Sequence, residues 1–326
     1  NPTNSDTSDM VFRRFPEYDS LVGPEGWKVI FGIHRDSKGR LWVAGAEALG
    51  LLSQGDSGEE PSFRHFRIET FESDPNRQVI HTVKEDQQGG IWVVSGFSLH
   101  RFDVESEAVE TYSLEDMGIL SRGLDPIYEL LIDQEGGIWL GAQEGVYHSR
   151  GENPAFKPIR INQEDRPLIL TAVMRDSYGQ VWMGTEKAGI AIADQTGEVY
   201  QRIDAEVGGL SADFIMCLLE EQSSGQVWAG TYGGGLNVLQ LKREKATGKV
   251  MGVEVRKIYA SPGEESVYPD RYIYDLYQET ASEVWIGSFR GIGRVKSDLS
   301  NSVLKSLFVG NQVHLDPEGQ LWVGAD

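Results

Sequence analysis

One phrase recurs along this chain at long intervals: a short polar turn, then an apolar residue and a tryptophan. Aligned on tryptophan, the copies read DSKGRLWVAG, DQQGGIWVVS, DQEGGIWLGA, DSYGQVWMGT, QSSGQVWAGT, ETASEVWIGS and DPEGQLWVGA. The seven residues concerned are Trp42, Trp92, Trp139, Trp182, Trp228, Trp285 and Trp322, spaced by 50, 47, 43, 46, 57 and 37 positions. This period is far too long for a helical heptad and is typical of a four-stranded propeller blade.

Each unit can be divided into four strands. An apolar run such as VIHTV predicts the first strand, and the Asp-x-x-Gly turn after it predicts a short hairpin, because Asp accepts hydrogen bonds from turn amides and Gly takes a positive φ. The tryptophan segment is the second strand. Runs such as GVYHSR (145–150) and VYQRI (199–203) predict the third and fourth. No amphipathic helical pattern is found. We expect each tryptophan to pack between neighbouring sheets.

Two units depart from the phrase. The fifth has Gln222 where the others have Asp, and the sixth has Glu279 and Ser282 in place of Asp and Gly. The first hairpin of the sixth unit should therefore be distorted, because it lacks both the side-chain acceptor and the flexible turn residue.

The two ends of the sequence suggest how the ring closes. The segment MVFRRF (10–15) matches the fourth-strand pattern, whereas QVHLDPEGQLWVGAD at the end supplies only strands one and two of a last unit. We predict an all-β fold, a seven-bladed β-propeller of four-stranded antiparallel blades forming a single domain over residues 1–326. The N-terminal strand would pair into the last blade and hide the sheet edges. Strand three of that blade would begin after Asp326, so a longer parent chain is expected.

Composition excludes several classes of function. Thirty basic and 50 acidic residues give a net charge of −20, which argues against binding to nucleic acid and against direct membrane contact. The single cysteine, Cys217, cannot form an internal disulfide and is expected to be a buried thiol. Gly-x-Ser-x-Gly, HExxH and P-loop motifs are absent from the sequence. We therefore predict no catalytic residues, no cofactor and no metal site.

The fifth unit carries a more specific pattern. Residues 209–239 read GLSADFIMCLLEEQSSGQVWAGTYGGGLNVL, with Leu-Ser-x-x-x-Ile ahead of the tryptophan phrase and Gly-Leu after it. This combination resembles the two-component regulator propeller repeat, and the resemblance extends over all seven units, less closely in the first, sixth and seventh. It implies a periplasmic sensor propeller of a membrane-anchored regulator with a histidine kinase or cyclase output. Several members are thought to detect oligosaccharides, and a homodimer of the full-length protein is a further expectation.

Because the residues that match the repeat have structural roles, we expect ligand contacts to lie in the variable loops. In a propeller, one face carries the loops after the tryptophan strands and the loops that lead into each blade. The candidates there are cationic or aromatic: Trp27, Arg77, Phe97, Arg122, Arg166, Lys187, Tyr232, Arg271, Tyr272, Phe289 and Arg290. Arginine beside aromatic rings suits a carboxylated sugar or another acidic ligand, and equally suits a protein partner.

Three hypotheses about function follow. The first is a non-catalytic, extracytoplasmic domain that senses a small-molecule or oligosaccharide ligand, or binds a protein, and so shifts a conformational or dimer equilibrium. The alternative is a propeller polysaccharide lyase or glycoside hydrolase with carboxylates in the central funnel. The third is a purely structural interaction module. The sequence leaves these three open.

Overall fold

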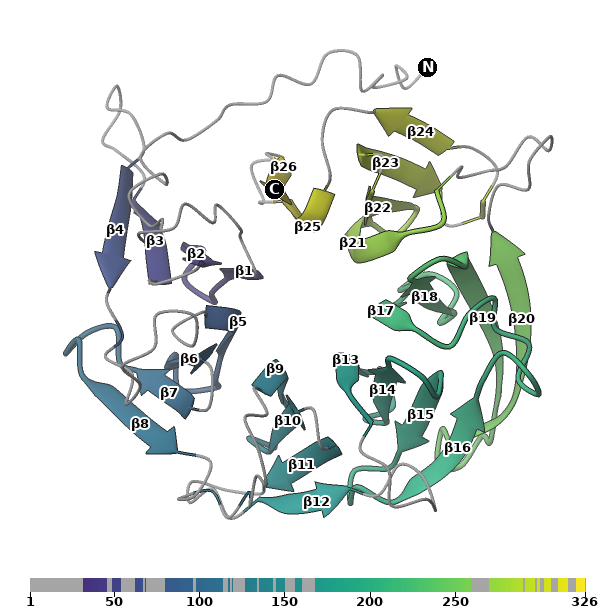
Figure 1. Cartoon of the computed structure of the whole chain (residues 1–326), viewed down its shortest axis with the longest axis horizontal. Coiled ribbons are helices and arrows are strands. Elements are labelled where there is room, and N and C mark those ends of the chain that lie inside the picture. Colours follow the sequence, from purple (N-terminus) through teal and green to yellow (C-terminus); the bar gives the residue numbers. More distant parts are fainter. Residues whose placement is uncertain are drawn as a thin grey trace.

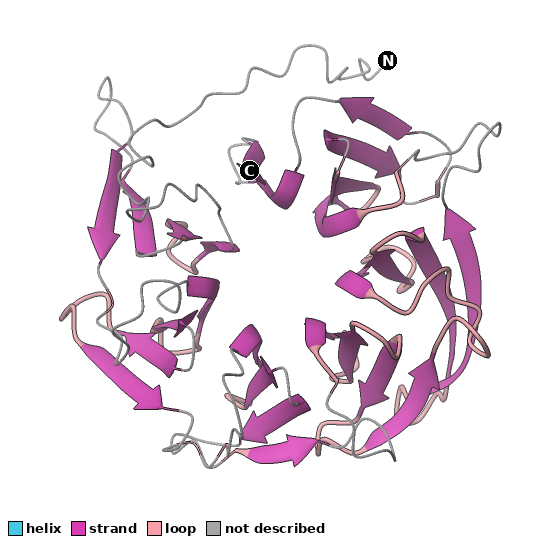
Figure 2. Ribbon diagram, in the orientation of Figure 1, coloured by secondary structure: helices cyan, strands magenta, loops and turns pink. Residues whose placement is uncertain are grey.

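The fold is that of a computed structural model of the 326-residue chain. It describes residues 32–45, 49–53, 62–66, 68, 80–95, 98–113, 117, 119, 127–133, 135–142, 145–149, 156–159, 168–258, 270–289, 291–296, 298–299, 302–305, 310–315 and 321–325. Within these ranges the secondary structure consists of strands and loops, without helix (Figure 2). The strands form antiparallel sheets arranged in a ring (Figure 1).

The first strand of each sheet lies nearest the centre of the ring (Figure 1). These strands are β1 (Gly32–Arg35), β5 (Ile80–Glu85), β9 (Ile127–Ile132), β13 (Leu170–Arg175), β17 (Ile215–Glu220), β21 (Ile273–Thr280) and β25 (Gly310–Leu315). The second strands carry the tryptophans: β2 (Leu41–Ala44), β6 (Ile91–Ser95), β10 (Ile138–Ala142), β14 (Val181–Thr185), β18 (Val227–Thr231), β22 (Glu283–Ser288) and β26 (Leu321–Ala325).

The third and fourth strands lie progressively outward (Figure 1). The third strands are β3 (Leu49–Ser53), β7 (Ser98–Phe102), β11 (Gly145–Ser149), β15 (Ile190–Ala193), β19 (Gly235–Arg243) and β23 (Gly291–Lys296). The fourth strands are β4 (Ser62–Phe66), β8 (Val109–Ser113), β12 (Lys157–Ile159), β16 (Val199–Ile203), β20 (Val250–Ile258) and β24 (Ser302–Lys305). Blades one to six are the sheets β1–β4, β5–β8, β9–β12, β13–β16, β17–β20 and β21–β24.

The prediction of seven four-stranded blades is wrong. The described residues form six four-stranded blades, and β25 and β26 make a two-stranded sheet. The physical reason is that the repeated phrase specifies only the first hairpin of a unit, and β25 and β26 form that hairpin around Trp322. The segment 10–15, predicted to complete this sheet and close the ring, lies outside the described residues.

The repeated tryptophans are core residues, as predicted. The six whose side chains are described, in blades one to six, are at most 7% exposed. The aspartate of the turn does more than the sequence suggested. In blade four, Oδ1 of Asp176 accepts the amides of Tyr178 and Gln180, and Oδ2 accepts the indole N–H of Trp182 at 2.9 Å. The same indole bond occurs in blades one, two and three.

Blades five and six lack this bond. In blade five the turn is closed by Glu221 rather than by the aligned Gln222: its carbonyl accepts the amide of Gly225, and its carboxylate accepts the hydroxyl and amide of both Ser223 and Ser224. In blade six the register shifts by a bulge between Gln278 and Thr280, which confirms the predicted distortion. As a result, the buried indole N–H groups of the blade-five and blade-six tryptophans have no hydrogen-bond partner among the described residues.

The glycine two positions after the tryptophan allows the next blade to approach closely. A Cβ built at Gly184 would lie 2.7 Å from Ile215 of blade five, and one at Gly230 would lie 2.6 Å from Ile273 of blade six. Both distances are shorter than a van der Waals contact allows, so a larger residue would push the neighbouring blade away. In blades four and five, the glycine of the Trp-x-Gly phrase therefore permits close packing at the seam with the next blade.

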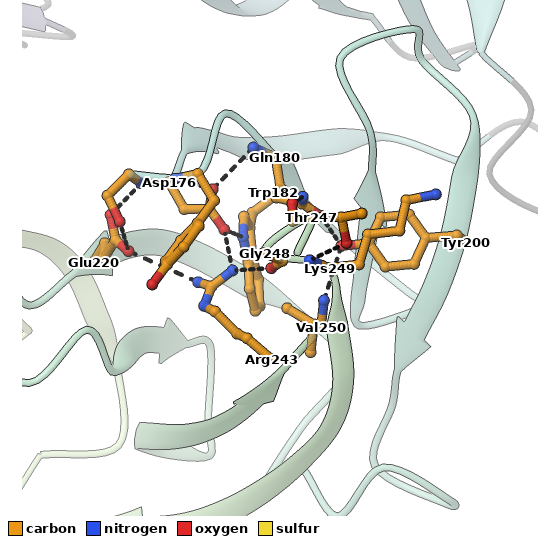
Figure 3. A network of polar contacts seen from close by, with 12 residues as sticks. Asp176, Gln180, Trp182, Tyr200, Glu220, Arg243, Thr247, Gly248, Lys249 and Val250 are labelled. Atoms are coloured by element: carbon orange, nitrogen blue, oxygen red, sulfur yellow. Dashed lines mark hydrogen bonds and ion pairs between the residues drawn. The ribbon is translucent and has the colours of Figure 1, made fainter. Parts of the chain in front are cut away.

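Blade five has the longest outer strands, and its β19–β20 hairpin reaches back over blade four (Figure 3). Arg243, at the end of β19, donates to Oδ2 of Asp176 at 2.9 Å and to the carbonyl of Gly248 at 3.0 Å. Its guanidinium also lies 4.6 Å from the ring centre of Tyr178. These contacts fix blade five to blade four on the turn face, defined as the face that carries the hairpin turns between first and second strands.

Candidate functional site

The opposite face, here called the loop face, carries the segments that precede each first strand and follow each second strand. Four aromatic residues lie there in blades five and six. Phe214 directly precedes β17 and Tyr232 directly follows β18, while Tyr272 precedes β21 and Phe289 follows β22. Because first and second strands are antiparallel neighbours, the start of one and the end of the other meet at the same edge of the blade.

The four rings contact one another in series, and we call them the aromatic ladder. Ring centroids of Phe214 and Tyr232 are 5.3 Å apart, those of Tyr232 and Tyr272 are 4.8 Å apart, and those of Tyr272 and Phe289 are 5.9 Å apart. The last two pairs meet edge to face, at 68° and 61°, and the first is tilted by 32°. These separations and angles lie in the favourable range for aromatic pairs, so the series stabilises the junction between two blades.

The backbone beneath the ladder is tied across the seam. Tyr232 donates its amide to the carbonyl of Phe214 at 2.9 Å, and Phe289 donates to Tyr272 at 3.2 Å. An antiparallel bridge pairs Tyr232 with Tyr272, and the carbonyl of Arg271 accepts the amides of both Gly233 and Gly235. The rings are therefore carried by four loops, each hydrogen-bonded to the next.

The loop that holds Tyr232 requires glycine. Gly233 and Gly235 have φ values of 94° and 75°, which non-glycine residues rarely adopt. Between them, a Cβ at Gly234 would lie 2.5 Å from the hydroxyl of Ser211. That serine is held in turn by Asn237, which is fully buried and exchanges two hydrogen bonds with it, at 2.9 and 2.7 Å. The Gly-Gly-Gly run thus brings Tyr232 close to the ordered loop that leads into blade five.

Two members of the ladder are well exposed: Tyr232 has 49% and Phe289 has 56% of its surface accessible. Phe214 and Tyr272 are half-buried. Large apolar side chains in contact with one another and with solvent are uncommon on a monomer unless they serve an interaction. The ladder is the only cluster of contacting, exposed aromatic rings on the loop face among the residues that the structure describes.

On the loop face, two carboxylates are hydrogen-bonded to the backbone, whereas two cationic side chains are exposed. Asp213 accepts the amide of Ala205 at 2.7 Å, and Asp270, only 2% exposed, accepts the amide of Tyr272 at 3.1 Å. Arg271 is exposed and makes no ion pair with a described residue. Lys187, on the β14–β15 loop of blade four, is 76% exposed and lies 3.6 Å from Glu186. Near the ladder, the carboxylates of Asp213 and Asp270 accept backbone amides, whereas Arg271 is exposed to solvent.

Of the eleven predicted site residues, the structure brings Tyr232, Tyr272 and Phe289 together, with Arg271 adjacent in sequence and Lys187 on the neighbouring blade. Six lie outside the described residues: Trp27, Arg77, Phe97, Arg122, Arg166 and Arg290. Sequence reasoning missed Phe214. The signal was present, because Phe214 stands directly before an apolar first strand, as Tyr272 does in the next unit.

The innermost strands place titratable groups at one repeated position. The first strands of six sheets contain a bulge, namely β5, β9, β13, β17, β21 and β25. The residue after the bulge pairs with the residue two positions beyond the tryptophan of the second strand. Glu129, Cys217 and Asp275 occupy this position in β9, β17 and β21. Burial raises the pKa of the Glu129 carboxyl, an effect that the nearby Lys84 opposes. Burial also raises the pKa of the Cys217 thiol, with a further contribution from Asp275, so this cysteine is a neutral buried thiol, as predicted.

The described part of the chain contains no group of three or more His, Cys, Asp or Glu side chains placed to hold a metal ion. No helix able to cross a membrane occurs within the same ranges.

The comparisons with known proteins show the fold. No protein-family model matches the chain, and no curated protein matches it. Its structure is similar to YCF48 from Cyanidioschyzon merolae, with a TM-score of 0.62 and 13% identity over 91% of this chain and 93% of that one. It is also similar to a chain of the Mitotic Checkpoint Complex, with a TM-score of 0.62 and 15% identity over 90% and 83% of the two chains. These likenesses establish the fold alone.

Two further alignments are with extracellular domains assigned to hybrid two component systems of B. thetaiotaomicron. That of BT3049 has a TM-score of 0.36 and 15% identity over 96% of this chain and 44% of that one. That of BT4673 has a TM-score of 0.34 and 17% identity over 90% and 46%. The chain thus spans less than half the length of each, and at these TM-scores neither alignment adds to the fold. Membership of the regulator family stays a prediction from the repeat.

Proposed function

We propose that this chain is a non-catalytic recognition propeller that binds its ligand on the loop face of blades five and six. The observation that carries the proposal is the aromatic ladder, in which four rings from four separate loops meet, and Tyr232 and Phe289 remain about half exposed. Burying apolar rings lowers the free energy, and these two rings remain in contact with water. A binding partner that covers them would gain this burial free energy.

The backbone beneath the rings supports this proposal. Hydrogen bonds between Tyr232 and Phe214, and between Phe289 and Tyr272, already fix the loops in the unbound chain. A surface ordered before binding loses less conformational freedom when a ligand arrives, so more of the contact energy appears as affinity. Function is thereby assigned to variable loops on a rigid scaffold, as is usual for propellers and other repeat folds.

We further propose that the domain is the extracytoplasmic input of a two-component-type regulator. The support is the repeat pattern of blade five, whose residues have scaffold roles: Leu210 is buried, Ser211 is bonded to Asn237, and Ile215 packs in the core. Binding at the seam of blades five and six would favour one conformational or dimer state of the full-length regulator over another.

The proposal is tested with a matched pair of variants. Tyr232→Ala/Phe289→Ala removes both exposed rings, whereas Tyr178→Ala removes an aromatic ring that is 54% exposed on the turn face. Thermal melting of all three proteins is measured against a panel of neutral and acidic oligosaccharides and short peptides. A compound that raises the Tm of the wild type and of Tyr178→Ala, but not of the double variant, supports the proposal.

Two results would count against it. A compound that raises the Tm of the double variant as much as that of the wild type would place binding elsewhere. Release of products from an oligosaccharide, abolished by Glu129→Gln, would favour the lyase or hydrolase alternative, because Glu129 is a half-buried carboxyl whose raised pKa suits a proton donor.

A further inference from the structure

The angles within the aromatic ladder restrict what can bind to it. The C–H face of a pyranose ring stacks best on an open aromatic face. In the ladder, Tyr272 meets Tyr232 and Phe289 edge to face, at 68° and 61°, so neighbouring rings are not coplanar. The rings therefore present a stepped apolar surface rather than a continuous platform. Such a surface is matched by branched or aromatic side chains of a protein, which fill steps between rings.

The charges beside the ladder restrict the partner further. Asp213 and Asp270 both accept backbone amides, so their charges are partly satisfied within the loops. Arg271, exposed and adjacent to Tyr272 in the chain, is available to an incoming anion. Its guanidinium can hold a carboxylate through two parallel hydrogen bonds. Arg271 thus offers one contact for a negative group, although the whole chain carries a charge of −20.

From these two observations we infer that the ladder docks a peptide segment of a partner protein in which an apolar side chain stands beside a carboxylate. The apolar side chain packs between the rings of Tyr232 and Phe289, and the carboxylate pairs with Arg271. The inference rests on the proposed function, since it names the class of ligand for the same face. Aromatic residues and arginine are the residue types that most often dominate protein interfaces, which agrees with this composition.

A second copy of the chain is a less favourable occupant. Two chains that each carry −20 repel one another at moderate ionic strength, even though Arg271 offers the opposite sign locally. A partner segment that is acidic but belongs to another protein meets that positive region without bringing a like-charged propeller with it.

The test uses synthetic peptides of about twelve residues in three matched sets. The first places Leu, Phe or Trp beside Glu, the second places the same apolar residues beside Lys, and the third keeps Glu but replaces the apolar residue with Ser. Fluorescence polarisation gives the Kd of each peptide for the wild type, Tyr232→Ala/Phe289→Ala, Arg271→Glu and Tyr178→Ala. We expect the first set to bind best, and to lose at least about ten-fold in affinity with the double variant, a factor equivalent to about 1.4 kcal/mol.

The Arg271→Glu variant gives the more specific test of the charge contact. It should weaken the Glu peptides and strengthen the Lys peptides, a reversal that loss of folding cannot produce. The inference is overturned if the three peptide sets bind equally, or if the reversal does not occur. It is also overturned if sedimentation shows a dimer of the wild type that the double variant lacks, because a second copy then covers the rings. Peptides that fail while an oligosaccharide binds at the ladder would overturn this inference and leave the proposed function standing.

Discussion

The indole N–H of Trp182 donates to Oδ2 of Asp176 at 2.9 Å, and both side chains are fully buried. The same carboxylate holds two turn amides through Oδ1 and receives Arg243 from the next blade. One aspartate therefore connects a hairpin turn, the core of blade four and Arg243 of blade five. The acidic position of the repeated phrase is thus part of the core as well as of the turn.

Asp176→Ala should lower the free energy of unfolding by about 3 kcal/mol or more, because it leaves the indole N–H without its acceptor and removes the carboxylate to which Arg243 donates. Denaturant unfolding followed by tryptophan fluorescence measures the loss. Asp103→Ala is the control, since Asp103 caps a turn through the amides of Glu105 and Ser106 and accepts no indole. Equal losses in the two variants would contradict a role beyond capping.

Trp182→Phe should cost more than Trp228→Phe, by about 1 kcal/mol. Both substitutions remove similar buried area from tryptophans that are fully buried. Only Trp182 also gives up a hydrogen bond, because the indole N–H of Trp228 has no partner among the described residues. The comparison is made by denaturant unfolding of the two single variants. A larger loss for Trp228→Phe would refute this account of blade five.

Gly230→Ala should destabilise the protein by about 2 kcal/mol, because the added Cβ would lie 2.4 Å from the sulfur of Cys217 and 2.6 Å from Ile273 in the next blade. Gly252→Ala is the matched control on β20, where the nearest atoms to the added Cβ are 3.7 Å away. Its effect should stay within about 0.5 kcal/mol. Differential scanning calorimetry separates the two. A tolerated Gly230→Ala would show that the seam between blades five and six can open.

His100 should make stability depend on pH. Burial lowers the pKa of its ring from 6.5 to about 4, with Nδ1 2.9 Å from the hydroxyl of Thr111. Because the unfolded chain takes up the proton first, the stability held above pH 6.5 is lost as pH falls toward 4. Melting at closely spaced pH values should show a decline between pH 6.5 and 5 that His100→Asn flattens. An unchanged slope in the variant would mean that other groups cause the decline.

Most of the blade architecture could be predicted from the sequence, because it follows from a repeated local pattern. The strand positions around Trp182 and Trp228 follow from the apolar runs and the turn residues, and the distortion at Glu279 follows from the missing turn residues. The number of four-stranded blades was predicted wrongly. The repeated phrase counts only the first hairpin of each unit, and the sheet that carries Trp322 has two strands among the described residues.

The candidate site was predictable only in part. Tyr232, Tyr272 and Phe289 could be assigned to one face from propeller geometry, but their mutual contact depends on how two blades meet. The bond between the amide of Gly233 and the carbonyl of Arg271 forms across that seam, far apart in sequence. Arg243 was not predicted, because its role depends on the unusual length of β19 and β20, which the repeat does not encode.

The central claim is that the ladder of blades five and six is the binding face. Calorimetric titration of the strongest binder from the oligosaccharide and peptide panels into the wild type, Tyr178→Ala and Tyr232→Ala/Phe289→Ala tests it most directly. We expect equal Kd values for the first two proteins and at least ten-fold weaker binding to the double variant, because only that variant loses the exposed rings. The same Kd for all three proteins would contradict the claim.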